Sequence, residues 1–430
     1  MEYHQVVTSF LTTEGQVLLL RRSGKVGSHR GKWSAVSGYL EGNEQPLARA
    51  VTEIREELGL SQEQISLSRV GETLRAYDEE NDTVWIIHPF LFEAVSTSVK
   101  LDWENVDYRW VAPAQLPSYV TVPKLRETLD RVQYDLQSAP ASLTDVVHKV
   151  KQVGEDRVHG ATFIGREALG LLSEAGQSSD ARNTDTLFSH LLLIGLRLRR
   201  TQPAMANVWN LTGKLLQTVD QHRATGTALR DLRTLIQTKS AQILEESAQA
   251  SEDASRNTVQ ILPHKGVVLT HSYSSTVLRS LELAFKGGRR FRVYATESYP
   301  GMEGKQLAKE LITLGIPVTS IADSAVGSIL HEVDSVLVGA DSVLKDGSLI
   351  HKVGTRDIGI AAEKRRIPVY CSCETSKFST QDFLGERPET STVFDLTPPE
   401  FVAGYITEEE KLAPAGVEQR IRGLQKRVYP

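Results

Sequence analysis

The stretch Gly38–Leu60 reads GYLEGNEQPLARAVTEIREELGL, and its second half has the features of one well-bounded helix. Pro46 suits the first turn, because its missing N–H would be unpaired there, and Gly59 suits the residue after the last turn. The apolar residues between them recur at helical spacing and form one stripe: Leu47, Ala50, Val51, Ile54 and Leu58. The pattern therefore predicts a helix over residues 46–58 with one buried face.

Three glutamates lie on a different face of this predicted helix. Glu53, Glu56 and Glu57 stand at positions i, i+3 and i+4, so their carboxylates can converge on one point. A hard cation with oxygen ligands, Mg²⁺ or Mn²⁺, would relieve the repulsion among them. Such a cation can also neutralise phosphate charge and activate a water molecule. From the three residues alone, a solvated acidic face is the favoured interpretation.

The whole stretch resembles the Nudix box, G-x5-E-x7-R-E-U-x-E-E-x-G-U, where U is aliphatic. The resemblance implies that Glu53, Glu56 and Glu57 bind the metal, with Glu44 and the Gly38 carbonyl as auxiliary groups. It also implies hydrolysis of a nucleoside diphosphate linked to another group, with Mg²⁺ or Mn²⁺ as cofactor.

One fixed position of the box departs from the pattern. Thr52 stands where the family has an arginine, which orients a neighbouring glutamate. A lysine or arginine from elsewhere could substitute for it. Downstream, Glu104 and Asp107 are candidates for an additional base, although ordinary surface positions explain them better.

The chain has 430 residues, too many for one ordinary core, so we expect two or three domains. Short strand-like runs over residues 1–137 fit the α/β/α sandwich of a Nudix domain, and the polar run after them is a candidate linker. Residues 143–255 show helical periodicity and predict a helical connector. In residues 256–430, apolar runs alternate with helical segments, which is typical of a Rossmann-like doubly wound sheet. The predicted fold class is therefore α/β with several domains.

Several blocks of residues 145–380 resemble a second family. LTHSYSSTVLRSLELA, VYATESYPGMEGKQLAKEL and VLVGADSVLKDGSLIHKVGT, with the upstream VHGATFIG, resemble blocks of the alpha, beta and delta subunits of initiation factor two-B. That family also contains methylthioribose-1-phosphate isomerase and ribose-1,5-bisphosphate isomerase. The resemblance implies a homo-oligomer, either a dimer or a hexamer built of dimers. It also implies a ligand pocket for a sugar phosphate or nucleoside monophosphate.

The pocket is expected at the carboxyl ends of the strands, where doubly wound sheets bind their ligands. Gly354 and Thr355 offer backbone N–H groups at the start of a helix, a favourable place for phosphate, and Lys352 adds a positive charge. The residues assigned to this pocket are His271, Ser272, Asp341, His351, Lys352, Gly354, Thr355, Gly160 and Ala161.

Three departures weigh against isomerase chemistry in this pocket. Ser272 stands in place of the isomerases' cysteine, and a hydroxyl is a far weaker acid than a thiol. His351 replaces an asparagine, and Tyr299 replaces an arginine. These changes bring the site nearer to the regulatory subunits, although His351 could titrate near neutral pH and support another proton transfer.

Net charge, hydropathy and cysteine content exclude several classes of protein. A net charge of −5 and the lack of a long basic run argue against nucleic-acid binding. No apolar stretch is long enough to span a membrane, and the first residues do not read as a signal peptide. Two cysteines, Cys371 and Cys373, fit buried thiols and a cytoplasmic setting.

We therefore expect a pyrophosphohydrolase that acts on a nucleotide-linked small molecule and carries a second, phosphate-binding domain. The alternatives are a regulatory protein of the initiation-factor type with weak or no hydrolysis, and a sugar-phosphate isomerase in the C-terminal half.

Overall fold

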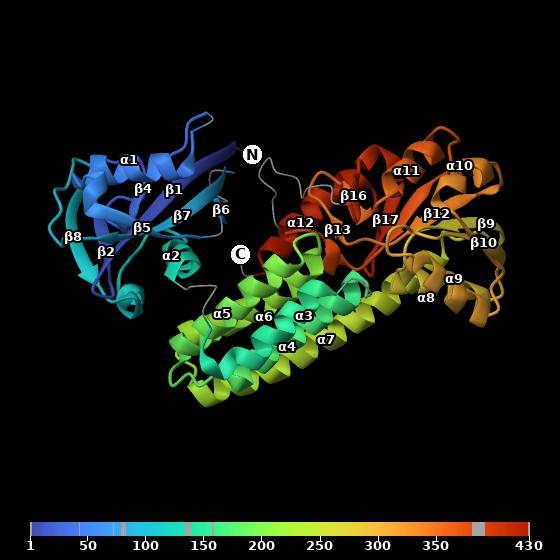
Figure 1. The fold of residues 1–430 in the computed structure, drawn as a ribbon, viewed down its shortest axis with the longest axis horizontal. Helices are drawn as coiled ribbons and strands as arrows, with labels where there is room; N and C mark the ends of the chain where they lie inside the picture. Colours follow the sequence, from blue (N-terminus) through green and yellow to red (C-terminus); the bar gives the residue numbers. More distant parts are fainter. Residues whose placement is uncertain are drawn as a thin grey trace. The chain divides into compact units, whose positions relative to one another are not determined.

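The computed structural model describes residues 2–42, 44–71, 73–78, 83–133, 139–156, 159–380 and 392–428. The chain divides into two compact units, residues 1–138 and residues 139–429. Figure 1 colours them from blue through cyan for the first unit, and from green to red for the second. Among the helices in these described ranges, none is long and apolar enough to cross a membrane.

The first unit is built on an eight-stranded mixed sheet with the order β3-β2-β1-β7-β5, while β4 pairs with β1, β6 with β7 and β8 with β2. The strands are β1 (Glu2–Thr13), β2 (Gln16–Arg22), β3 (Trp33–Ser34), β4 (Val36–Tyr39), β5 (Ile65–Val70), β6 (Leu74–Asp78), β7 (Thr83–Ala94) and β8 (Asn105–Val111). β1 and β2 are antiparallel, with Thr13 opposite Gln16, whereas β1 and β7 are parallel.

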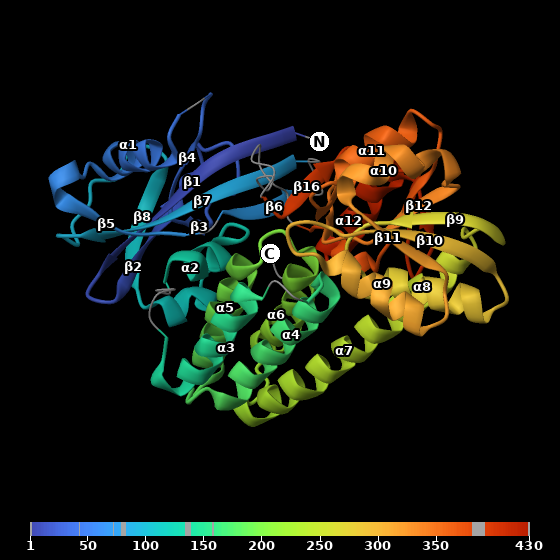
Figure 2. The ribbon, with the colours of Figure 1, turned by 45° about the vertical axis from the view of Figure 1, so that its right-hand side comes forward.

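One helix covers each face of this sheet (Figure 2). α1 (Pro46–Leu58) begins and ends as the sequence predicts. It buries Ala50, Ile54 and Leu58 against the residues of β2 on its side, Leu18 and Leu20. α2 (Leu125–Gln133) packs on the opposite face, where the alternate residues of β2 point. Both faces of β2 are apolar because both are covered, which confirms the α/β/α arrangement. Two short 3₁₀ helices, η1 (Gln62–Gln64) and η2 (Pro113–Ser118), complete the unit.

The second unit opens with helices. They are η3 (Ala141–Leu143), α3 (Thr144–Glu155), α4 (Ala161–Ser178), α5 (Thr184–Thr201), α6 (Ala206–Ala224) and α7 (Leu229–Val259). α4 packs against α5, α6 and α7, so it lies at the centre of the group. Its residues Ala168, Leu169 and Leu172 are completely buried there. The helical periodicity of the sequence is confirmed, and α7 continues directly toward the first strand of the following sheet (Figure 1).

A seven-stranded sheet follows, with the order β11-β10-β9-β12-β15-β17-β18. Its strands are β9 (Lys265–Thr270), β10 (Arg290–Thr296), β11 (Val318–Ile321), β12 (Ser335–Val338), β15 (Val369–Ser372), β17 (Gly404–Ile406) and β18 (Lys411–Leu412). All pairs are parallel except β17 with β18. β10 and β11 therefore follow β9 on one side, whereas β12 and the later strands lie on the other side of β9. The boundary between β9 and β12 is the switch point of a Rossmann-like sheet.

Helices and a small sheet surround these strands. The helices are α8 (Ser275–Lys286), α9 (Glu303–Thr313), α10 (Val326–Ile329), α11 (Thr355–Glu363) and α12 (Val417–Gln425). The 3₁₀ turns are η4 (Asp323–Ala325), η5 (Leu330–Glu332), η6 (Thr375–Lys377), η7 (Pro399–Phe401) and η8 (Pro414–Gly416). The small antiparallel sheet consists of β13 (Ser342–Val343), β14 (Leu349–Lys352) and β16 (Phe394–Thr397).

Candidate functional sites

The glutamates of α1 are more buried than the helical wheel predicts. Glu53 is 7% exposed and Glu57 is 5% exposed, whereas Glu56 is exposed to solvent. Two of the three residues assigned to a separate polar face therefore lie in the interior, between α1 and the sheet. Buried carboxylates require hydrogen-bond or ion-pair partners, and Glu53 and Glu57 have different ones.

Glu57 is held by two N–H donors. Its Oε1 accepts from the backbone N–H of Ser37 on β4 at 2.9 Å. Its Oε2 accepts from the side-chain amide of Asn105, the first residue of β8, at 2.7 Å. Burial raises the pKa of Glu57 to about 8, although both hydrogen bonds oppose this increase. Asn105 is a site residue that the sequence did not single out, because only the pairing of β8 with β2 brings it to α1.

Glu53 lies directly against Gly38. A Cβ atom on Gly38 would come within 1.6 Å of the Glu53 Oε1 atom, so only glycine leaves room for this carboxylate. Arg49, one turn earlier on α1, forms an ion pair with the same oxygen. Glu104 lies close enough to raise the pKa of both Glu53 and Glu57, in addition to the larger effect of their burial. Of the two downstream acids, Glu104 is therefore the one near the site.

The carboxylate of Asp107, the other downstream candidate, is half-exposed and lies 4.0 Å from Arg109.

The metal site predicted from the Nudix box stays a prediction. Within the described ranges, no three His, Cys, Asp or Glu side chains are gathered so that they could hold a metal ion. The predicted convergence of Glu53, Glu56 and Glu57 is thus not present, because Glu56 points outward. The donors nevertheless suit Mg²⁺ or Mn²⁺, since they are carboxylate and carbonyl oxygens. The contact between Glu53 and Gly38 also occupies a space that any larger residue at position 38 would fill.

In the second unit, several predicted pocket residues follow adjacent strands of the large sheet. His271 and Ser272 come directly after β9, and Asp341 follows β12, so the switch point brings them to one edge. His351 and Lys352 come from β14, whose residue Ile350 accepts a hydrogen bond from the Asp341 backbone N–H at 3.0 Å. These five residues are all buried.

Ser272 takes part in a polar chain that the sequence did not reveal. Its backbone has a positive φ of 67°, and its Oγ donates to Glu303 Oε1 at 3.2 Å. The same oxygen forms an ion pair with the Lys352 ammonium group. Glu303 Oε2 is buried and has no hydrogen-bond partner among the described residues. The hydroxyl that replaces the isomerases' thiol thus lies beside a carboxylate, which could accept its proton.

The two pocket histidines are uncharged at neutral pH. Burial lowers the pKa of His351 well below its usual range, and the nearby His271, Lys377 and Lys352 lower it further. This corrects the expectation that His351 titrates near neutral pH. His271 has both ring nitrogens occupied, by Thr296 Oγ1 at 2.6 Å and by the Val353 carbonyl at 2.9 Å. Its ring therefore supports the pocket wall.

Asp341 is a pocket residue whose carboxyl group has a raised pKa. Burial raises its pKa to about 6, while Lys377 and Lys352 act in the opposite direction and Glu303 adds to the increase. A carboxyl group that titrates near 6 can bind or release a proton in the physiological range. Its side chain lies at the strand end where sequence analysis placed it.

The start of α11 differs from the prediction. Gly354 is its N-cap residue, as expected, but the Gly354 N–H donates to Asp395 Oδ2 at 2.7 Å. The Arg356 N–H donates to the same oxygen at 3.2 Å. An internal carboxylate from β16 therefore occupies the place assigned to a phosphate. The hydroxyl of Thr355 is also engaged, since it donates to the Lys352 carbonyl at 2.6 Å.

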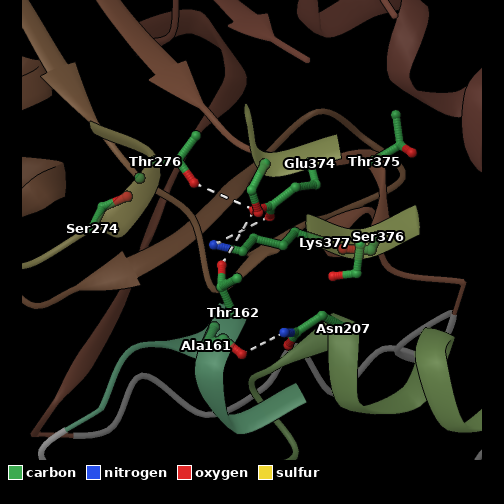
Figure 3. Close-up of polar contacts among 12 residues, drawn as sticks. Ala161, Thr162, Asn207, Ser274, Thr276, Glu374, Thr375, Ser376 and Lys377 are labelled. Atoms are coloured by element: carbon green, nitrogen blue, oxygen red, sulfur yellow. Dashed lines mark hydrogen bonds and ion pairs between the residues drawn. The ribbon is translucent and has the colours of Figure 1, made fainter. Parts of the chain in front are cut away.

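The start of α4 lies beside a buried ion pair, and no side chain caps it. Gly160 is its N-cap residue, without a side-chain hydrogen bond. The Ala161 carbonyl is held by the side-chain amide of Asn207. Figure 3 shows this end of α4 facing the buried pair of Glu374 and Lys377. The assignment of Gly160 and Ala161 to the pocket stays a prediction. A helix N-terminus and a lysine both favour negative charge, and the Glu374 carboxylate lies beside both.

Glu374 and Lys377 are the main residues of this region that sequence analysis missed. Glu374 Oε1 accepts from the hydroxyls of Thr162 at 3.4 Å, Thr276 at 3.3 Å and Ser251. Its Oε2 lies 3.7 Å from Lys377 Nζ (Figure 3). Burial alone would lower the pKa of Lys377, but Glu374 and Asp341 outweigh it, so the ammonium stays charged. The block CETSKF carried the only sequence signal for this pair.

Together, the two units define a protein that joins a NUDIX domain to a Rossmann-like domain of the type found in initiation factor 2 subunits. The NUDIX domain model matches residues 2–132. The Initiation factor 2 subunit family model matches residues 157–391 of the 430, which is more than half of the chain. The chain belongs to the Initiation factor 2 subunit family. Both resemblances drawn from the sequence are confirmed, as is the predicted fold class.

Relatives of the second unit carry two kinds of name. Ribose 1,5-bisphosphate isomerase of Thermococcus kodakarensis is 27% identical over 64% of this chain and 92% of the relative. A protein of Pyrococcus furiosus named translation initiation factor eIF-2B subunit 2-like is 31% identical, over 61% of this chain and 94% of the relative. A crystal structure of translation initiation factor eIF-2B from Pyrococcus horikoshii matches with a TM-score of 0.56 at 26% identity, over 63% of this chain and 98% of that one.

Proposed function

We propose that the first unit is a divalent-metal-dependent pyrophosphohydrolase that acts on a nucleoside diphosphate linked to a sugar or a similar group. The observation that carries this proposal is the paired placement of Glu53 and Glu57. Glu57 is fixed by Ser37 and Asn105, and Glu53 lies on the glycine of the box. Two buried carboxylates held next to each other are unfavourable unless a cation compensates them.

The cofactor we propose is Mg²⁺ or Mn²⁺, held by Glu53, Glu56, Glu57 and the Gly38 carbonyl, with Glu44 nearby. When bound, the cation supplies positive charge to the phosphates and lowers the pKa of a bound water. The chain's own residues then have separate tasks: Asn105 fixes the orientation of Glu57, and Glu104 is the candidate acceptor for the proton of the attacking water.

The test is hydrolysis of a panel of nucleotide sugars, ADP-ribose and dinucleotide polyphosphates with Mg²⁺ or Mn²⁺. Wild type is compared with Glu56→Gln, and with Glu93→Gln as a matched control on an exposed position of the same unit. We expect hydrolysis of at least one substrate class, loss of it in Glu56→Gln, and no change in Glu93→Gln. A protein that binds metal but hydrolyses none of the panel would refute the proposal.

For the second unit we propose a binding site for a sugar phosphate or nucleoside monophosphate. Its support is the combination of Lys377 with the uncapped N-terminus of α4. Calorimetric titration with ribose 5-phosphate and AMP tests it, with Lys377→Met/Glu374→Gln as the variant expected to lose binding, because the second change removes the unpaired buried carboxylate. Sugar-phosphate isomerisation is a second candidate activity of this unit, because some relatives are named isomerases and because Ser272 donates a hydrogen bond to Glu303. An NMR assay on ribose 1,5-bisphosphate separates binding from turnover.

The regulatory alternative and the assembly state are tested separately. Capture of a translation-factor partner by the full chain would favour a regulatory protein, and its absence would remove the assembly part of that idea. We propose a homo-oligomer, a dimer or a hexamer, as membership of the Initiation factor 2 subunit family implies. Light scattering on the purified chain measures this directly. The cytoplasmic location expected from the free thiols Cys371 and Cys373 stays a prediction.

A further inference from the structure

The Nudix box of this chain lacks its arginine. Thr52 occupies that position. Its hydroxyl donates a hydrogen bond to the Ala48 carbonyl, one turn earlier on α1, at 3.0 Å. A threonine that bonds back to its own helix cannot orient a neighbouring carboxylate. Glu53 therefore needs its partner from elsewhere.

Arg49 is that partner. It lies one helical turn before Glu53, and its guanidinium forms an ion pair with Glu53 Oε1. The pair is largely sheltered, with side-chain exposures of 27% for Arg49 and 9% for Glu53. Glu44 and Glu56, two further carboxylates of the box, also act electrostatically on the Arg49 charge. Arg49 thus lies close to three of the box's carboxylates.

Helix stability does not explain this pair. Ion pairs at this spacing contribute little to a helix, and those with the basic residue first contribute least. Arg49 also keeps its Nε atom buried without a hydrogen-bond partner among the described residues. An unused donor beside Glu53 can hold a second carboxylate or a phosphate oxygen without releasing the first.

We propose that Arg49 performs the positioning role of the missing arginine, by holding the Glu53 carboxylate against Gly38 in the orientation that metal binding requires. The replacement works because residue 49, four positions before Glu53, lies on the same face of α1, whereas residue 52 is next to Glu53 in sequence, so a long flexible side chain reaches the carboxylate from either place. The inference rests on the proposed hydrolase function and names a residue that the box motif does not contain.

The experiment compares wild type with Arg49→Ala, Arg55→Ala and the double variant Arg49→Ala/Thr52→Arg. Arg55 is the matched control, because it is an exposed arginine on the same helix. Mn²⁺ affinity is measured on the full chain by electron paramagnetic resonance of the free ion. Hydrolysis of the substrate found in the panel gives kcat and KM. Circular dichroism checks that every variant is folded.

We expect Arg49→Ala to lose about 10- to 100-fold in Mn²⁺ affinity or kcat, with a much smaller change in KM. Arg55→Ala should resemble wild type, and the double variant should recover most of the loss because it restores an arginine to the box. Equal Mn²⁺ affinity and kcat in Arg49→Ala and wild type would overturn the inference. So would a double variant as defective as Arg49→Ala. Absence of hydrolysis in wild type would instead refute the proposed function, and the Mn²⁺ measurement would still decide the role of Arg49.

Discussion

Replacing Asp341 by asparagine is expected to make the second unit more stable at neutral pH. Burial raises the pKa of Asp341 from an ordinary value of 3.8 to about 6. Ionising this carboxyl is therefore harder in the folded state than in the unfolded one. A difference of this size corresponds to about 3 kcal/mol of lost stability wherever the group is fully ionised. Asparagine has nearly the same shape and carries no charge, so the substitution should restore most of that free energy.

The sign and the pH range follow from the raised pKa. Between about pH 4 and pH 6 the folded state binds the proton more tightly than the unfolded state, so stability falls as the pH rises through this window. The advantage of Asp341→Asn should be about 3 kcal/mol at pH 8 and about half of that at pH 5, where Asp341 is protonated in the folded protein.

The assay is urea unfolding of the full chain, read by pulsed hydrogen exchange in peptides from β12 and β14. These peptides report the second unit alone. Asp180→Asn, an exposed aspartate of the same unit, is the matched control and should change stability little at either pH. A variant less stable than wild type at pH 8, or an advantage that does not shrink at pH 5, would refute the reasoning. Ligand binding should weaken in the same variant, because functional sites keep unfavourable charges for their chemistry.

Three further substitutions test other contacts. Asn105→Ala should reduce metal-dependent hydrolysis by roughly 10- to 100-fold, since it frees Glu57 Oε2, and a metal titration of activity measures the change. Gly38→Ala should leave the unit folded but inactive, because its Cβ displaces the end of Glu53; unaltered hydrolysis would contradict the predicted site. Lys377→Met should destabilise the second unit by about 3–5 kcal/mol, because it leaves the Glu374 carboxylate buried without its counter-charge. Thermal unfolding measures this, and the added change Glu374→Gln should restore most of the loss.

Local signals in the sequence determined much of the fold. The bounds and the apolar face of the helix over residues 46–58 follow from the sequence, because a proline and a glycine mark its ends and a periodic stripe marks one face. The alternation of strands and helices after residue 256 predicted the Rossmann-like sheet, since each strand there is short, apolar and followed by a turn. These features depend on neighbours in the chain.

The parts that sequence could not predict depend on residues far apart in the chain. Asn105 meets Glu57 across 48 positions, and Asp395 meets Gly354 across 41. In both cases a polar side chain fills a place that local patterns assign to solvent or ligand. His351 behaves differently from expectation for the same reason: its burial comes from the packing of the small sheet against the large one, and burial sets its charge.

The hydroxyl cluster around Glu374 has a consequence for how this chain can be divided. The three hydroxyls that contact Glu374 come from α4, α7 and α8, while the carboxylate itself stands just before η6. A cut between the helices and the sheet would strip a buried acid of two of these donors at once. The helical and sheet parts of the second unit should therefore be expressed, or exchanged with those of a relative, as one piece.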